Sequence, residues 1–254
     1  MKENILVLVR ATPEKSRKHS HLVCVAGIND NNEWRRLYPV KFSYGDALID
    51  FNKRDMIQAT LANPDNDKRL ESRKVIGHNN LNSQMDTDAV RERILPLVTS
   101  IEKLSAANAS LGVIKPELLG VNIEVNSTDI YDNQTYFSIA GDYLSEKREK
   151  VKMPVKLSYH FKCKGEPECN GHNIVLIDWE LNELTRNIIR KDKDPKIVEE
   201  KIRVKFFDNM KERDLYFYMG THFRFKTWII IGIFYPKQRT VIEEKTVQKT
   251  LFDV

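Results

Sequence analysis

Two cysteines and two histidines in one short stretch are the residues of this sequence best suited to chemistry. They follow the spacing H-x2-C-x5-C-x2-H and are His160, Cys163, Cys169 and His172. Two thiolates and two imidazoles are a common ligand set of tetrahedral Zn²⁺, and four protein ligands leave no open position for a substrate. The glycines and the proline between them favour turns. The spacing therefore predicts a structural zinc site that clamps a loop between two strands.

The fourth ligand of this site stays open at the level of sequence. Because side chains alternate along a strand, His160 could point away from the loop, and His78, His222 or Glu168 could replace it. Three protein ligands and a water molecule would instead make the site a catalytic candidate. The alternative without a metal is a pair of unpaired surface thiols beside an unrelated His172.

Two segments mix basic and aromatic residues in a way that suits contact with nucleic acid. Aromatic rings stack on bases, and arginine and lysine pair with phosphates. The candidate residues are Trp34, Arg35, Arg36 and Tyr38 in one segment, and Phe223, Arg224 and Lys226 in the other. On a strand, Trp34, Arg36 and Tyr38 would share one face. The alternative for the first segment is ordinary packing with arginines at the surface.

An enzymatic alternative rests on carboxylates. Asp178 and Glu180 follow a short apolar strand, and with Asp214 they could bind a divalent metal, as in a metal-dependent nuclease. No lysine stands two residues beyond Glu180, where such a nuclease would need one. The simpler interpretation is that Asp178 caps a helix and Glu180 favours its first turn. The sequence has no G-x-S-x-G motif, phosphate loop or dinucleotide fingerprint.

The end of the sequence carries an apolar pair on a polar segment. Residues 237–245 are charged and are expected to form an exposed tether, and the segment Gln248-Lys249-Thr250-Leu251-Phe252 follows. Q-x-x-L-F resembles the peptide by which bacterial replication and repair proteins dock on the sliding clamp. The resemblance implies that Leu251 and Phe252 fill an apolar pocket of the clamp and that Gln248 bonds at its rim. Alternatively, Leu251 and Phe252 pack on the domain itself.

The elements that must position these residues differ between the two halves. Strands are expected at 5–9, 21–28, 33–40 and 55–62, with turns at 29–32 and 64–67, which suggests a small β-barrel or a curled sheet. Residues 86–108 have helical periodicity, and Pro96 should kink or split that helix. Later, strands are expected at 118–125, 155–161 and 174–177, helices at 178–190 and from 194, and an antiparallel pair at 215–219 and 228–235.

These elements predict an α+β fold made of three parts. We expect a barrel-like N-terminal unit with a helical connector at 1–126, an α+β unit with a zinc-knuckle loop at 135–236, and a tether with a docking peptide at 237–254. The polar loop at 126–134 is the expected boundary. The composition, with 41% hydrophobic and 30% charged residues in 254, is that of a globular protein.

Charge and cysteine content limit the class of protein. The formal net charge is +5, and an acidic middle lies between basic flanks that suit phosphate backbones. Three cysteines do not make a disulfide framework. The longest apolar run is too short to span a bilayer, and no signal pattern precedes residue 10. A cytoplasmic protein without membrane contact is expected, and its oligomeric state stays open.

Several segments together resemble an uncharacterised family of bacterial proteins over most of the chain. They are residues 22–28, 33–39, 163–172 and 177–180, with the cysteines and Asn170-Gly171-His172 among them. The resemblance implies no activity and transfers no functional residue. From the residues themselves we expect a DNA-binding accessory protein of DNA replication, repair or phage defence, recruited by its clamp-type peptide. A metal-dependent nuclease or another nucleic-acid-processing enzyme is the alternative.

Overall fold

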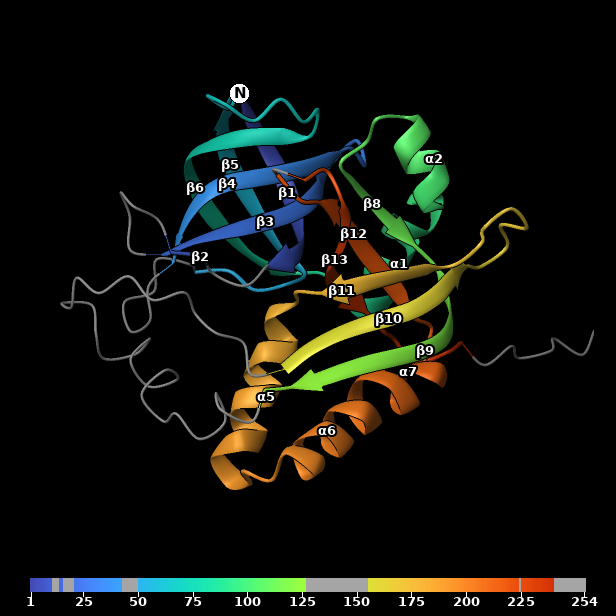
Figure 1. Cartoon of the computed structure of the whole chain (residues 1–254). Helices are drawn as coiled ribbons and strands as arrows, with labels where there is room; N and C mark the ends of the chain where they lie inside the picture. The colour runs from blue at the N-terminus through green and yellow to red at the C-terminus, as the bar shows by residue number, and fades with distance from the viewer. Residues whose placement is uncertain (11–13, 16–20, 43–49, 127–154, 224, 240–254) are drawn as a thin grey trace, which may run out of the picture.

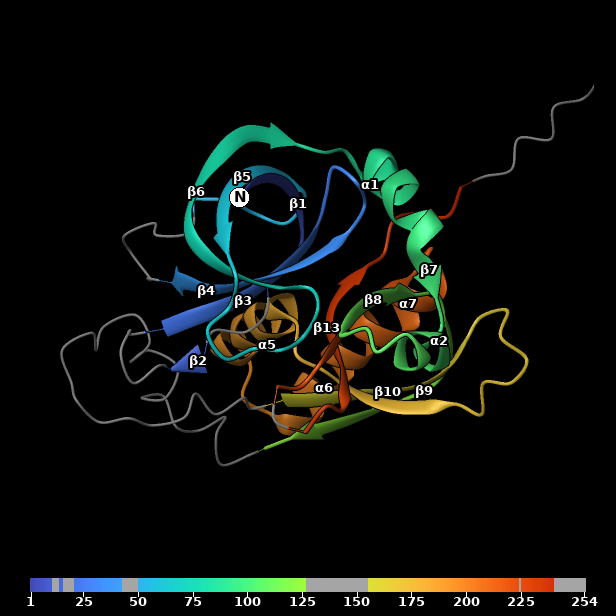
Figure 2. The same cartoon turned by 90° about the horizontal axis from the view of Figure 1, so that it is seen from above.

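The structure is a computed structural model that describes residues 1–10, 14–15, 21–42, 50–126, 155–223 and 225–239 (Figure 1). It contains strands and helices, so the predicted α+β class is confirmed. Figure 1 shows three layers: a barrel, a seven-stranded sheet and a group of helices on the far side of that sheet. Figure 2 looks down onto the barrel, with the helices behind the sheet.

The N-terminal unit is a barrel, as the turn spacing predicted, and five of the six strands of its sheet close it. Its sheet has the order β1-β5-β6-β4-β3-β2, and pairing of β1 with β3 closes it. The strands are β1 (Lys2–Arg10), β2 (Glu14–Lys15), β3 (His21–Asn29), β4 (Trp34–Phe42), β5 (Asp55–Ala62) and β6 (Ser72–Gln84). Buried aliphatic residues such as Ile5, Val25 and Leu37 fill the interior. The sequence did not delimit β6, because most of its positions after Val75 are polar and exposed.

The connector is split at its proline, as predicted. Helix α1 (Thr87–Ile94) begins at Asp86, whose side chain accepts from the Ala89 amide. A 3-10 turn, η1 (Leu95–Leu97), and the short strand β7 (Val98–Thr99) follow. Helix α2 (Ile101–Ala106) then begins after the cap Ser100. The helical periodicity of the sequence therefore covers two short helices, which pack in different hydrophobic cores.

The second sheet has the order β7-β8-β12-β13-β11-β10-β9. Its longer strands are β8 (Leu111–Ile114), β9 (Pro116–Val125), β10 (Val155–Cys163), β11 (His172–Leu176), β12 (Tyr216–Thr221) and β13 (Trp228–Phe234). Strands β12 and β13 pair antiparallel, which confirms the predicted pair. Strands β10 and β11 also pair antiparallel, and the loop between them carries the cysteines.

The faces of this sheet bury different neighbours. On β12, Phe217 and Met219 face the helices, whereas Tyr216 and Tyr218 face the barrel and α1. The helices are α5 (Trp179–Lys191), α6 (Pro195–Arg203), the π-helical turn η2 (Val204–Asp208) and α7 (Asn209–Lys211). Asp178 caps α5, in agreement with the simpler interpretation of the sequence, and Asp194 caps α6, which begins where the sequence predicted. Alternation along each strand thus supplies two hydrophobic cores.

The predicted boundary at 126–134 lies almost entirely outside the described residues. Within them, the change from barrel to second sheet falls between β6 and β7, along the connector. None of the helices in the described ranges has the length and apolarity needed to cross a bilayer.

Candidate metal centre and aromatic hairpin tip

Four side chains with metal-binding atoms converge beside the end of β10. Cys163 ends that strand, Cys169 lies in the following loop, His172 begins β11, and Glu102 lies in the first turn of α2. One ligand atom from each residue lies within 4.8 Å of those of the others. The four residues could therefore hold one metal ion.

Short contacts link these four side chains to one another. The Cys169 Sγ lies 3.2 Å from His172 Nε2, which in turn lies 3.1 Å from a Glu102 carboxylate oxygen. The Cys163 backbone amide donates to Cys169 Sγ at 3.2 Å. Gly165 and Gly171 have φ values of +82° and +98°, a conformation that favours glycine. The turn residues between Cys163 and His172 therefore do what the sequence indicated, and fold the loop back on itself.

The chemistry of Cys163 fits a buried ligand better than a nucleophile. Burial raises the pKa of its thiol to about 12. A thiol with such a pKa is protonated at neutral pH and reacts slowly with electrophiles. A bound cation would reverse this, because a coordinating thiol loses its proton to the metal's charge.

The fourth member of the cluster differs from the predicted one. His160 lies on the exposed face of β10, opposite to the buried face that carries Phe161 and Cys163. Glu102 takes its place, from a helix about sixty residues earlier in the sequence. Among the described residues, neither His78, His222 nor Glu168 belongs to the cluster. No local motif could have indicated Glu102, since only the tertiary fold brings α2 to this loop.

The tip of the β12–β13 hairpin exposes two aromatic side chains. Phe223 is 57% exposed and Phe225 is 72% exposed. The His222 ring stacks on Phe225 at a centroid distance of 4.8 Å, and the Arg69 guanidinium lies over Phe223 at 5.5 Å. Lys226 is exposed beside them, and Arg224 lies outside the described residues. The hairpin tip thus exposes Phe223 and Lys226, the two described members of the second predicted group.

Asp67 holds Arg69 in position at this tip. Its carboxylate accepts from the Arg69 guanidinium at 2.5 Å and from the Ser72 hydroxyl at 2.7 Å, and Arg69 also donates to the Thr221 carbonyl at 2.7 Å. Burial opposes ionisation of Asp67, but these hydrogen bonds outweigh it and lower its pKa to about 2. The loop before β6 is thereby fastened to the hairpin.

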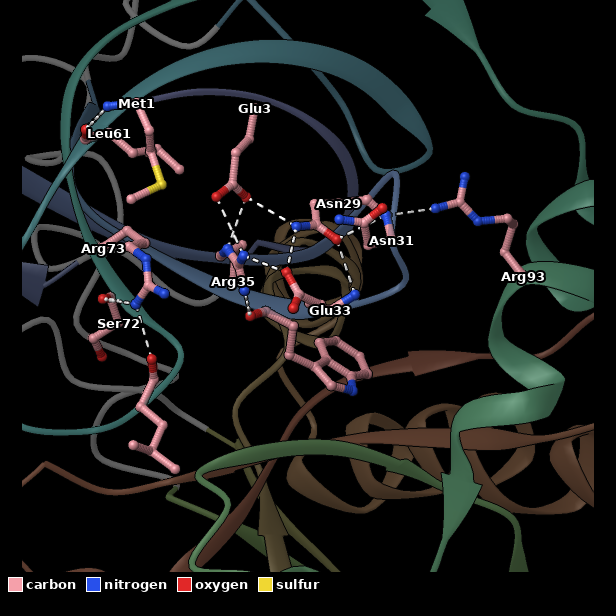
Figure 3. Close-up of polar contacts among 12 residues, drawn as sticks. Met1, Glu3, Asn29, Asn31, Glu33, Arg35, Leu61, Ser72, Arg73 and Arg93 are labelled. Atoms are coloured by element: carbon pink, nitrogen blue, oxygen red, sulfur yellow. Dashed lines mark hydrogen bonds and ion pairs between the residues drawn. The ribbon is translucent and has the colours of Figure 1, made fainter.

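The first predicted group, on β4, is largely engaged inside the protein. Arg35 lies between the carboxylates of Glu3 and Glu33, at 2.7 and 2.6 Å (Figure 3). Arg36 is buried and donates to the Ser110 carbonyl at 2.7 Å, across the junction of barrel and sheet. Trp34 packs edge-on against Tyr218, and Tyr38 alone of the four is strongly exposed.

The acidic residues of the enzymatic alternative occupy two separate networks. The Lys53 ammonium lies 2.9 Å from Asp178 and 3.0 Å from Glu180, so the barrel supplies a lysine that the local motif lacks. Asp178 is fully buried and also accepts from the backbone amides of Glu180 and Ile233. Asp214 instead contacts Lys115, Tyr216 and Arg91.

The residues of the predicted docking peptide, Gln248, Leu251 and Phe252, lie outside the described residues.

Two family models match the chain and meet in the connector. One, described as a domain of unknown function (DUF8757), matches residues 97–254, which is more than half of the chain. The other, described as a domain of unknown function (DUF8758), matches residues 1–98. No curated protein matches the chain. The two matched regions correspond to the barrel with α1 and to the second sheet with its helices.

The anchor of the hairpin tip predicts a dependence of stability on pH. The pKa of Asp67 is about 2 in the folded protein, below its ordinary value of 3.8. A lowered pKa stabilises the fold above the ordinary value, and this contribution is lost as the pH falls through the folded value. We expect Asp67→Asn to cost about 1–2 kcal/mol at pH 6, since solvent partly screens this ion pair, and progressively less between pH 4 and pH 2. Urea unfolding at each pH measures this. Asp65→Asn, in an exposed carboxylate of the same loop, is the control, and an equal pH dependence in both variants would refute the assignment.

Proposed function

We propose that this chain, which belongs to the DUF8757 family of domains of unknown function, is a nucleic-acid-binding accessory protein of DNA replication, repair or phage defence. The observation that carries the proposal is the β12–β13 hairpin tip, where Phe223 and Phe225 are exposed beside cationic side chains. In this function the two rings stack on unpaired bases, and the neighbouring cations contact the phosphates.

The physical support for this proposal is the combination of rings and charge. Base stacking on an aromatic side chain contributes about 1–3 kcal/mol per base and tolerates any sequence, because every base has a π-face. Lys226 is exposed at the tip, and Lys68 is exposed and precedes Arg69 in the chain; neither pairs with an acidic side chain in the described part of the chain. Arg69 is held over the Phe223 ring by Asp67 and Thr221. The rings are therefore pre-positioned, which reduces the entropy lost on binding.

We infer that the metal of the four-residue cluster is Zn²⁺ and that its role is structural. Two thiolates, an imidazole and a carboxylate are ligands that zinc accepts, and together they complete a tetrahedral shell. The ion would link α2 to the loop between β10 and β11, through Glu102 on one side and Cys163, Cys169 and His172 on the other. Such a link fixes the connector to the second sheet.

For recruitment we propose the C-terminal peptide. Leu251 and Phe252 would enter an apolar pocket of a bacterial-type sliding clamp, and Gln248 would bond at its rim. Of the predicted tether, Lys237 and Arg239 contact the folded part, so the residues that follow them would link it to the peptide, which suits a protein that must reach DNA while it is held at the clamp.

The enzymatic alternative draws on one specific observation. Lys53 completes a group of two carboxylates and a lysine with Asp178 and Glu180, as a metal-dependent nuclease would require. Against it, both oxygens of Asp178 already accept hydrogen bonds from Lys53 and from two backbone amides. A metal ion would have to displace the Lys53 ammonium, so we prefer the binding function.

The zinc assignment predicts the metal content of defined variants. After reconstitution with Zn²⁺ under reducing conditions, elemental analysis should find about one zinc per chain. Cys163→Ser and Glu102→Ala should lose it, with a fall in melting temperature of about 10 °C, because metal binding contributes to folding. His160→Ala is the matched control and should keep its zinc. Loss of zinc in His160→Ala, with retention in Glu102→Ala, would reverse the assignment of the fourth ligand.

The hairpin tip predicts a specific loss of affinity for single strands. Phe223→Ala and Phe225→Ala should each weaken binding of a fluorescein-labelled 20-nucleotide single strand by roughly 5- to 150-fold at constant salt, which corresponds to the loss of one stacked base. Ile197→Ala, which removes an exposed apolar side chain on α6, is the control. Fluorescence anisotropy measures all three. Equal affinities for the control and both phenylalanine variants would refute the stacking function.

The docking peptide predicts variants that lose clamp binding but keep their stability and their affinity for single strands. The double variant Leu251→Ala/Phe252→Ala should abolish binding of a bacterial sliding clamp, measured by surface plasmon resonance, without changing the melting temperature or the affinity for the single strand. Thr250→Ala should bind the clamp normally. A lowered melting temperature with unchanged clamp binding would indicate instead that the two residues pack on the domain.

A further inference from the structure

A basic cleft lies where the barrel, α1 and the end of β13 meet. Its volume is about 770 Å³. Six cationic side chains line it: Lys53, Arg54, Arg91, Arg213, Lys237 and Arg239. Two acidic side chains, Asp88 and Glu180, also line it. The excess of positive charge indicates an anionic ligand, because clefts with low-dielectric walls concentrate the field of their lining charges.

Three of the six cations are already neutralised by acidic partners. Lys53 pairs with Asp178 and Glu180. The Arg91 guanidinium lies 2.6 Å from Asp88 and 3.0 Å from Asp214. Arg239 pairs with Glu92 and, at 3.9 Å, with Asp88. These pairs account for both acidic side chains of the cleft.

The remaining three cations have no acidic partner within the described ranges. Arg54 donates to the Thr87 hydroxyl at 3.2 Å, and Arg213 and Lys237 form no side-chain ion pair there. The isolated β-bridge between Arg213 and Lys237 holds their backbones together. Side chains from the barrel and from the second sheet therefore present unneutralised positive charge to the same cleft.

The backbone at Arg54 is constrained in an uncommon conformation. Its φ is +74°, in the left-handed region that non-glycine residues rarely adopt. Its amide donates to the Val7 carbonyl at 2.7 Å, and its carbonyl accepts from the Met85 amide at 2.8 Å. Strained residues that the surrounding structure holds in place are concentrated at binding sites. Here two hydrogen bonds maintain a conformation that keeps Arg54 at the cleft.

The wall of the cleft formed by β12, β13 and the residues after β13 is apolar and aromatic. Tyr218, Phe234, Tyr235 and Pro236 line it. The Tyr235 hydroxyl lies 3.4 Å from Glu180 and so donates toward the polar side of the cleft. The partly exposed rings of Phe234 and Tyr235, beside three cations without an acidic partner in the described ranges, suit a ligand that combines phosphate with a planar ring.

We propose that this cleft binds the phosphate groups of a nucleotide or of a nucleic-acid strand through Arg54, Arg213 and Lys237. The site is separate from the hairpin tip, because Arg213 precedes β12 and Lys237 follows β13, at the end of the hairpin opposite to its tip. The proposal therefore stands independently of the stacking function. Arginine provides paired N–H donors and lysine a mobile ammonium, and the two residue types commonly contact phosphate together.

The test compares the double variant Arg213→Ala/Lys237→Ala with a control that loses the same charge. The control is Lys2→Ala/Lys196→Ala, in exposed lysines of β1 and α6. Both are made in the full chain and checked by circular dichroism and thermal melting. Lys237→Ala alone removes only an exposed side chain and serves if the double variant does not fold. The probes are a labelled 20-nucleotide single strand and inorganic pyrophosphate.

If the cleft binds a nucleic-acid strand, the cleft variant should bind the oligonucleotide at least about 10-fold more weakly at low salt. The slope of log K against log salt should shrink by about 1.4, because two phosphate contacts are lost. If the cleft binds a free nucleotide, pyrophosphate binding by calorimetry should be lost while oligonucleotide binding stays unchanged. Either result supports a phosphate site. Equal behaviour of the cleft variant and the control toward both probes would overturn it, whatever the phenylalanine variants show.

Discussion

The buried carboxylate of Asp178 is the constraint on which the arrangement of the three layers depends. It caps α5 through the Glu180 amide, accepts from the Ile233 amide of β13, and pairs with Lys53 of the barrel. Burial alone would lower the pKa of Lys53, but the two carboxylates more than reverse this and raise it. Removing one partner of a buried ion pair leaves an uncompensated charge, which costs about 3–5 kcal/mol. This ion pair therefore helps to hold the barrel over the sheet, and two of its members, Lys53 and Glu180, line the basic cleft.

The connector transmits this arrangement to the candidate metal centre. Helix α1 packs in the core between barrel and sheet through Val90 and Ile94, and its Arg91 reaches the cleft. The break at Pro96 then turns the chain, so that α2 packs in the opposite core through Ile101 and Leu104. Glu102 lies on this second helix, beside the cysteine loop. A metal ion held there would fix the second half of the connector, which contains α2.

Local signals explain what the sequence could predict. Asp178 and Asp194 are helix caps because their side chains accept hydrogen bonds from nearby amides. Pro96 splits a helix through its own ring and missing amide hydrogen. Gly165 and Gly171 permit left-handed turns. Glu102 and Lys53 carried no such signal, because each meets its partners only through the tertiary fold. Arg35 and Arg36 show the same limit. Side-chain alternation along the strand correctly predicted that they lie on opposite faces, but it could not predict their partners, Glu3 and Ser110.

The two proposed contact surfaces lie at opposite ends of one strand, and this limits the ligands that could use both. Strand β13 has seven residues, which corresponds to about 23 Å at 3.3 Å per residue. A mononucleotide is too small to span that length, so it could occupy the cleft or the hairpin tip but not both. A stacked single strand, with a rise of about 3.4 Å per nucleotide, covers it in roughly seven nucleotides. Linked binding at two such points multiplies their affinities, because the second contact becomes intramolecular. The geometry therefore favours a polymer over a free nucleotide wherever both surfaces contribute.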